Sequence, residues 1–292
     1  MNGKWSKWIA AGTFAAMFVF GGGLATTLYA QYAQPGQSAQ QPAPQLPDKD
    51  KANNTLTLDN APPPVNPEED AAYKAFQDSP GTELQKKIQL GEAFALKYPK
   101  SRYLPVIYST LTSAYVQTGQ VQKMEEVGDK EIELKPDDVQ VLAVLGQTIP
   151  RALSSSTANP DQELAKAEKY AKRAIELTPT LPKPPNLTDE VFASAKNQTL
   201  AMAHSGLGLV YVRRGKYADA IPELEASVKV DPTPDPVNYY LLGLSNEKTS
   251  HFADAEAAFT KCGTLPGSLQ ATCKKGAEES KKLGETQMSA PK

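Results

Sequence analysis

The chain has 292 residues, a formal net charge of −2 and two cysteines. This length is enough for one extended array of helices with tails at both ends. A near-neutral charge gives no basic footprint, which argues against a nucleic-acid-binding protein.

Residues 1–30 have the composition of a targeting segment. Both tryptophans lie beside lysines in the first ten positions, and the residues from there to Ala30 carry no charge. This run predicts either a cleaved signal peptide, with cleavage after Ala25 or Ala30, or a retained transmembrane anchor. Because the lysines hold the N-terminus inside, both outcomes export the rest of the chain to the periplasm or cell envelope.

Residues 31–68 are rich in Gln, Pro, Ala and Asn and have little apolar surface to bury. This composition predicts a flexible linker. No cysteine precedes Cys262, so a lipid-modified cysteine behind the leader is excluded. We therefore expect membrane contact only through residues 1–30, and only if they are retained.

Helical spacing of apolar residues continues over residues 69–283. It predicts a degenerate helix pair at 69–100, a pair at about 105–138 and a third at about 139–180. Between the helices of the third pair lies a polar insertion, after which Asn159 and Pro160 predict an N-cap and a first-turn proline.

A proline-rich extended stretch follows the third pair. Thr188 then predicts the start of one helix of about 25 residues that reaches Arg214, with acidic residues in its first turn. We interpret this helix as a merged spacer. The alternative is a protruding edge that binds a partner.

The last two pairs, at about 201–234 and 236–267, repeat one pattern at a constant offset of 35 residues. Small residues allow two helices to approach closely, large ones fill the space around them, and a proline ends the second helix. The residues that carry the pattern are Leu207, Gly208, Tyr211, Gly215, Tyr217, Ala220 and Pro232 in the first pair, and Leu242, Gly243, Phe252, Ala255 and Phe259 in the second.

This pattern resembles the tetratricopeptide repeat (TPR), a family of helix-turn-helix repeats. The resemblance covers about residues 69–266 and is strongest in the last third. It implies an all-α, right-handed solenoid with a concave groove that binds proteins or peptides. At Met124 and Gly128 the chain departs from the small and the large residue of the family pattern, so we expect that second helix to pack loosely.

The resemblance also implies which residues line the groove. Arg151, Arg213 and Lys248 lie five residues after the small first-helix residue in three successive pairs. Three cations in register would suit an acidic peptide or a C-terminal carboxylate, and an ordinary solvated row is the alternative. The carboxylate clamp of the family is not matched, because its positions hold Ser205 and the apolar groove candidates Leu209, Tyr240 and Leu244.

A closing helix is expected over 268–283, followed by a flexible tail at 284–292. In an exported chain, two cysteines at the separation of Cys262 and Cys273 predict a disulfide. Two buried thiols are the alternative. The bond would fasten the end of the array, where a terminal repeat lacks a neighbour.

The sequence holds no motif of a catalytic, nucleotide-binding or metal site. We expect His204 to be packed, His251 to be solvated, and Lys166 and Lys172 to lie on an outer helix face. We predict no enzyme activity, cofactor or metal. The leading hypothesis is an exported scaffold or adaptor for a protein or peptide of unknown identity. The alternative is a structural envelope subunit that self-associates through its terminal repeats.

Overall fold

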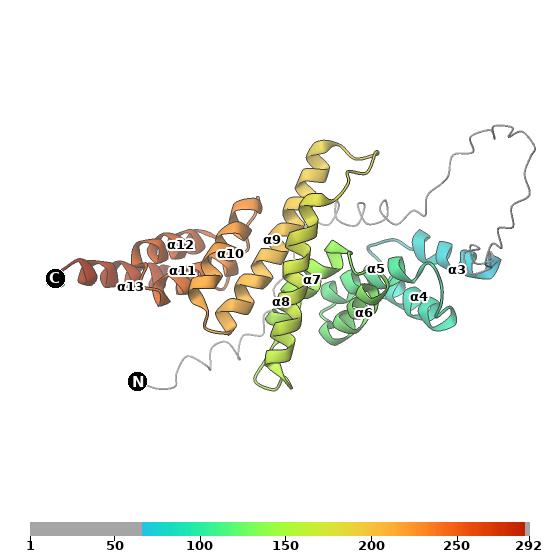
Figure 1. The fold of residues 1–292 in the computed structure, drawn as a ribbon, viewed down its shortest axis with the longest axis horizontal. Coiled ribbons are helices and arrows are strands. Elements are labelled where there is room, and N and C mark those ends of the chain that lie inside the picture. The colour runs from blue at the N-terminus through green and yellow to red at the C-terminus, as the bar shows by residue number, and fades with distance from the viewer. Residues whose placement is uncertain (1–65, 290–292) are drawn as a thin grey trace, which may run out of the picture. The chain divides into compact units, whose positions relative to one another are not determined.

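The computed structural model describes residues 66–289, and all regular elements in this part of the chain are helices (Figure 1). The predicted leader, and the linker as far as residue 65, lie outside the described residues. Contacts divide the described chain into two units, residues 66–104 and residues 105–289, and each is considered by itself.

The first unit contains α3 (Pro67–Asp78) and α4 (Leu84–Lys97). Asn66 caps α3, because its side chain accepts hydrogen bonds from two backbone amides of the first turn. The helix therefore begins within residues 31–68, the predicted linker. An Asn side chain directly before a proline is a strong signal for the start of a helix. α4 ends just before Tyr98 and Pro99, where the proline cannot continue a helix.

From α6 to α13, helices that follow one another in the chain pack on one another, in the order that the repeat pattern predicts. α7 packs on α8, α9 on α10 and α11 on α12, and α7 and α9 also contact each other. This is the arrangement that the TPR resemblance implies. The helices are α5 (Leu104–Gln117), α6 (Val121–Leu134), α7 (Val139–Ala152), α8 (Pro160–Leu177) with the 3-10 turn η2 (Thr178–Thr180), α9 (Asp189–Arg213), α10 (Tyr217–Val230), α11 (Pro236–Lys248), α12 (Phe252–Thr264) and α13 (Gln270–Ser289).

The small and large residues of the repeat pattern meet in the cores of the last two pairs. A Cβ on Gly208 would lie 2.7 Å from the side chain of Leu224, and one on Gly243 would lie 2.7 Å from the ring of Phe259. Each glycine therefore lets the large residue of the partner helix approach its backbone. Side-chain packing of this kind, rather than helix propensity, supplies most of the stability of such pairs.

The predicted loose packing of α6 is wrong. Met124 is fully buried, and a Cβ on Gly128 would lie 2.8 Å from the side chain of Leu145 in α7. In the family pattern, a large residue of the same helix pair fills this space. Here Leu145 of α7, the next helix, fills it instead.

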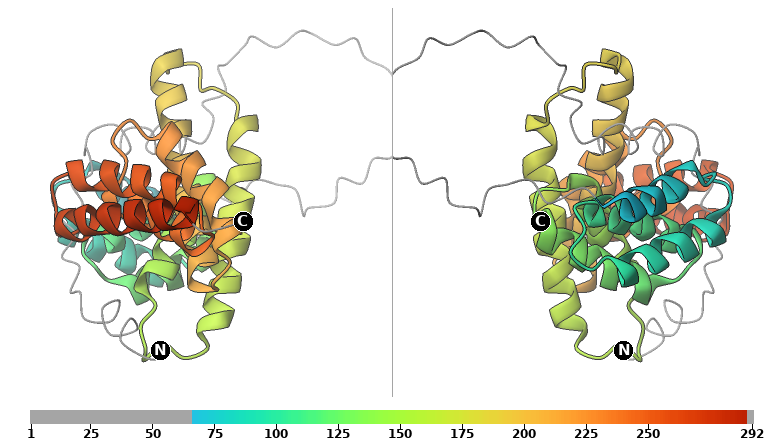
Figure 2. Two further views of the ribbon diagram at one scale, coloured as in Figure 1. Left: turned by 90° about the vertical axis from the view of Figure 1, so that its left-hand side faces the viewer. Right: turned by 90° about the vertical axis from the view of Figure 1, so that its right-hand side faces the viewer.

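The long helix predicted after Thr188 is present as α9, whose 25 residues begin where the Thr188 side chain accepts a hydrogen bond from the Val191 amide. Its first turns rise beyond α8 and α10 in two views (Figures 1 and 2). Farther along, α9 crosses α7 at close range: a Cβ on Gly206 would lie 2.3 Å from the carbonyl oxygen of Gly146. Only glycine fits at this backbone contact.

Two local predictions need correction. Pro160 occupies the first turn of α8 as expected, but the Asn159 side chain makes no cap hydrogen bond, because this residue adopts a left-handed conformation with φ of 53°. The closing helix does not end at Leu283 but continues to Ser289, so residues 284–289 are helical rather than a flexible tail.

The turns between paired helices require a left-handed residue. Gly119 and Gly215 both have φ of 70°, and Ser250 adopts the same conformation with φ of 64°. Glycine adopts this region without strain, whereas serine does not. None of the helices between residues 66 and 289 is both long and apolar enough to span a membrane.

Candidate interaction surface

Arg151, in the last turn of α7, is held by two neighbouring helices. Its guanidinium forms an ion pair with Asp235, the N-cap of α11, at 3.0 Å, and it donates a hydrogen bond to the Ser205 hydroxyl of α9 at 3.1 Å. Since its charge already has a carboxylate partner, Arg151 joins three first helices of the array instead of pointing at a ligand.

A buried chain of hydrogen bonds continues from Ser205. Its hydroxyl donates to Asn238 Oδ1 at 2.7 Å, and the Asn238 amide donates to Ser227 Oγ at 3.1 Å. The Ser227 hydroxyl in turn donates to the Ala201 carbonyl at 2.9 Å. All three side chains are buried, and their mutual hydrogen bonds fix α9, α10 and α11 against one another. Sequence reasoning missed this chain, although polar residues at core-facing helix positions are its signal.

Arg213, the second predicted groove cation, caps a helix. Its Nη2 donates to the Leu153 carbonyl at 3.2 Å, just past the end of α7, where helix carbonyls lack partners within the helix. Burial lowers the pKa of Arg213. This cation therefore stabilises the joint between α7 and α9.

Lys248, the third cation, ends α11 with its side chain 44% exposed and its Nζ 3.9 Å from a Glu247 carboxylate oxygen. It borders a shallow hollow that the start of α10 completes at Lys216 and Tyr217. Arg151 and Arg213 are thus engaged with other helices and Lys248 lies beside Glu247, so the structure offers no row of three ligand-facing charges.

The apolar groove candidates lie on two first helices. Leu209 in α9 and Leu244 in α11 are partly buried against the core, and the Tyr240 ring lies 5.9 Å from the Phe259 ring, centroid to centroid. Tyr240, Leu244 and Lys248 recur every fourth residue along α11, so they share one face of that helix. This face, called the α11 stripe below, combines an aromatic ring, an aliphatic side chain and a cation.

The two histidines lie as expected in outline. His204 is mostly packed, with its side chain 18% exposed and its Nδ1 2.7 Å from the Glu223 carboxylate of α10. His251 is exposed, and its Nδ1 lies 3.0 Å from the Thr249 hydroxyl. The His204 contact joins α9 to α10, whereas the His251 contact lies within the turn that precedes α12.

The prediction that Lys166 lies on an outer helix face is wrong. Its ammonium bridges from α8 to Glu125 and Asp129 of α6, at 2.5 and 2.6 Å. The Tyr170 hydroxyl donates to the same Asp129 at 2.8 Å. Lys166 therefore holds two helices together. Lys172 does lie on the surface, paired with Glu168 of its own helix.

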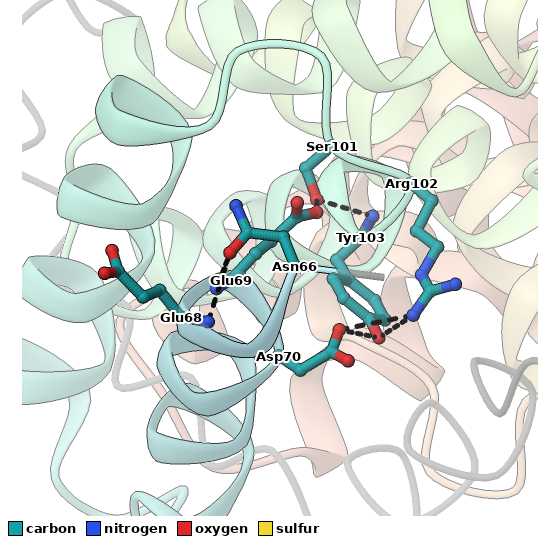
Figure 3. Close-up of polar contacts among 7 residues, drawn as sticks. All are labelled: Asn66, Glu68, Glu69, Asp70, Ser101, Arg102 and Tyr103. Atoms are coloured by element: carbon teal, nitrogen blue, oxygen red, sulfur yellow. Dashed lines mark hydrogen bonds and ion pairs between the residues drawn. The ribbon is translucent and has the colours of Figure 1, made fainter. Parts of the chain in front are cut away.

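In the first unit, polar residues join the start of α3 to the loop after α4 (Figure 3). The Tyr103 hydroxyl donates to Asp70 at 2.7 Å and accepts from Arg102 at 2.6 Å. The Tyr103 ring stacks on that of Tyr73 with centroids 3.9 Å apart. Burial, followed by the hydrogen bond to Asp70, raises the pKa of Tyr103. The cluster closes this helix pair, and its members already partner one another.

Glu131 in α6 is the most unusual titratable group of the described chain. It is fully buried, and neither carboxylate oxygen has a hydrogen-bond partner. Burial, followed by the charge of Asp138, raises the pKa of Glu131 to about 9. The sequence does not reveal this buried carboxyl group, because the later pairs carry small residues at the same place of the repeat. These are Ser227 and Cys262, seven residues after Ala220 and Ala255, just as Glu131 lies seven residues after Met124.

Among residues 66–289, no group of three or more His, Cys, Asp or Glu side chains is placed to hold a metal ion. The sulfurs of Cys262 and Cys273 are joined in a disulfide, with their Cα atoms 5.7 Å apart. The described surface therefore offers helix faces for contact, of which the α11 stripe combines apolar and charged groups.

No protein-family model matches the chain, and no curated protein is similar to it. Solved structures are similar at low identity. A thermophilic TPR protein of Thermus thermophilus is 17% identical over 73% of this chain and 98% of its own, with a TM-score of 0.44. MamA of AMB-1 is 17% identical over 70% and 96%, with a TM-score of 0.46.

A third structure is that of PilW, described as a widely conserved type IV pilus biogenesis factor. It is 14% identical over 77% of this chain and 96% of its own, with a TM-score of 0.47. Such identities transfer no partner and no role. The helix-pair arrangement of this chain rests on the contacts described above.

Proposed function

We propose that this chain is a non-enzymatic scaffold that binds a protein or peptide partner along the first helices of its last two pairs. The observation that carries the proposal is the α11 stripe. An aromatic ring, a leucine and a lysine at successive turns suit an amphipathic partner segment with an acidic residue at one end. Interfaces depend on such partly exposed aromatic and aliphatic anchors more than on rim charges.

We place this scaffold outside the cytoplasm, in the periplasm or cell envelope. The uncharged stretch that follows the N-terminal lysines supports this location, and so does the disulfide between Cys262 and Cys273, because such bonds persist in oxidising compartments. Whether the leader is cleaved or retained decides only whether the scaffold is released or tethered.

The alternative, self-association through the terminal repeats, has less support at the C-terminal end. There α13 lies along α12 (Figure 2). By helical spacing, the exposed Lys275, Glu279 and Lys282 lie on the face of α13 opposite the buried Cys273 and Ser280. A polar outer face is typical of a capping helix and disfavours stacking of a second copy.

Site-directed photo-crosslinking in the producing cell tests the proposal. A photoreactive phenylalanine analogue at Tyr240 or Lys248 should give a discrete adduct with one partner. The matched controls are Lys229 in α10 and Lys261 in α12, which are exposed lysines on second helices. They should give no such adduct.

Adducts of equal yield at all of these positions would refute a specific contact along α11. An adduct with twice the mass of the chain would instead support the self-associating subunit. Lys248→Glu, compared with Lys261→Glu, should weaken an existing adduct at Tyr240, most strongly at low salt, because an exposed charge acts within about 10 Å.

A further inference from the structure

α13 differs from the other helices of the array in how little it buries. Only Cys273 and Ser280 of this helix are buried, and its large apolar side chains, Leu283 and Met288, are 43% and 81% exposed. By contrast, α10 brings the fully buried Leu224 into its pair. Apolar burial is the main force that docks one helix on another, so it contributes little to the docking of α13.

The contact between α12 and α13 is close but is made by small residues. A Cβ on Gly276 would lie 3.0 Å from the ring of Phe259, and one on Gly284 would lie 3.5 Å from Cβ of Phe252. The buried Ser280 hydroxyl has no hydrogen-bond partner in the described chain, and this unmet group opposes docking.

The disulfide joins α12 to α13, whose docking is otherwise weak. Cys262 near the end of α12 and Cys273 in the first turn of α13 are both fully buried and are separated by 11 residues. In the chain-entropy model, a bond across a loop of this length favours the closed arrangement by a factor on the order of 100. For α13 the covalent bond thus takes the place of a buried apolar face.

We propose that the Cys262–Cys273 disulfide is a redox latch: its reduction releases α13 from α12 while α7 to α12 stay folded. The reductant is a dithiol. Its thiolate attacks one sulfur and breaks the S–S bond, its second thiol resolves the mixed disulfide, and it leaves as a disulfide. In total the dithiol gives up two electrons and two protons, and Cys262 and Cys273 each end as a thiol.

The latch changes what the C-terminal end of the array exposes. In the oxidised chain α13 covers Phe259, which is 3% exposed. In the reduced chain this ring and its apolar surroundings in α12 become accessible. Because both sulfurs are buried, the reductant reaches them only during local openings of α13, so the reaction is gated by the same weak docking.

Hydrogen exchange measured by mass spectrometry on the intact chain tests the latch, with dithiothreitol as the reductant. Reduction should lower the protection of the α13 amides by a factor on the order of 100, and the amides of α9, α10 and α11 should keep theirs. The double variant Cys262→Ala with Cys273→Ala should behave as the reduced protein and should not respond to dithiothreitol.

A second variant separates the latch from a general loss of structure. Ser280→Ala in the alanine background removes the unpartnered hydroxyl, so part of the α13 protection should return. The proposal is overturned if α13 stays protected in the reduced chain and in the double variant. It is equally overturned if α9, α10 and α11 lose protection together with α13, because the bond would then stabilise the whole array.

Discussion

At the scale of single residues, Glu131 makes the stability of the protein depend on pH. Its pKa rises from 4.5 to about 9 on folding, so the folded chain holds a proton that the unfolded chain releases between these values. The contribution of Glu131 to stability is therefore fully present below the lower value and is lost as pH rises through the window. The slope approaches about 1.4 kcal/mol per pH unit.

Glu131→Gln should remove this dependence, because an amide has the shape of the protonated acid and does not titrate. Urea unfolding of the full chain at several pH values from about 5 to about 8.5 measures the slope. Glu133→Gln changes an exposed glutamate of the same helix and should keep the wild-type slope. A wild-type slope in both variants would mean that Glu131 is ionised in the folded protein.

The turn residues Gly215 and Ser250 allow a matched exchange. Gly215→Ser places a side chain at φ of 70° and should lower stability by about 1 kcal/mol. Ser250→Gly releases strain but adds freedom to the unfolded chain, so stability should stay unchanged or rise by a few tenths of a kcal/mol. Thermal unfolding of the two variants gives the comparison. Equal destabilisation by both would assign the effect to side-chain contacts of the turn.

Single-residue roles were the least predictable part of the candidate site. Spacing placed Arg151 and Arg213 at equivalent repeat positions, but it could not show that Asp235 and the Leu153 carbonyl lie within reach. Both partners belong to other helix pairs. A repeat pattern describes only the contacts that recur from pair to pair, so it does not reveal contacts between particular residues of two pairs. The α11 stripe was easier to foresee, because Tyr240, Leu244 and Lys248 belong to one helix.

At the scale of elements, the crossing of α7 and α9 depends on glycine. Gly206→Ala would force a methyl group to 2.3 Å from the Gly146 carbonyl oxygen, and backbone cannot rotate away as a side chain can. We expect a loss of about 3 kcal/mol or more in the free energy of unfolding.

Gly284→Ala serves as the control for Gly206→Ala. It replaces a helical glycine whose new Cβ would make only ordinary contact with Phe252, at 3.5 Å. Stability should rise slightly or stay unchanged, since alanine favours helix. If Gly206→Ala proves equally harmless in urea unfolding, the two helices are not in backbone contact.

Element boundaries followed from the sequence where a strong local signal exists. Thr188 marks the start of α9, and prolines mark the ends of several second helices. The prediction failed where the signal is tertiary: α6 packs tightly because Leu145 of another pair reaches Gly128. The end of α13 was also wrong, since the helix continues past Leu283 to Ser289 although residues 285–289 are exposed. Local propensity carries no information about such neighbours.

At the scale of the whole molecule, export predicts a spectroscopic change. Trp5 and Trp8 are the only tryptophans, so cleavage after Ala25 or Ala30 leaves a mature chain that emits from tyrosine alone. Intact mass of protein from the native envelope should match one of these cleavage sites. A full-length mass would favour the retained anchor, and a cytosolic location would exclude both forms.

The Arg151–Ser205–Asn238–Ser227 chain bears on the modularity of the array. Repeat proteins commonly gain or lose units, because each unit meets its neighbours through similar surfaces. Here the partners are divided among three successive helix pairs, and removal of the pair at 201–234 would leave buried polar groups of its neighbours without partners. Duplicating that pair would also place the polar groups of its first copy next to a second copy, which has no Asn238 to bond them. The number and order of these three pairs are therefore fixed by chemistry that no single repeat contains.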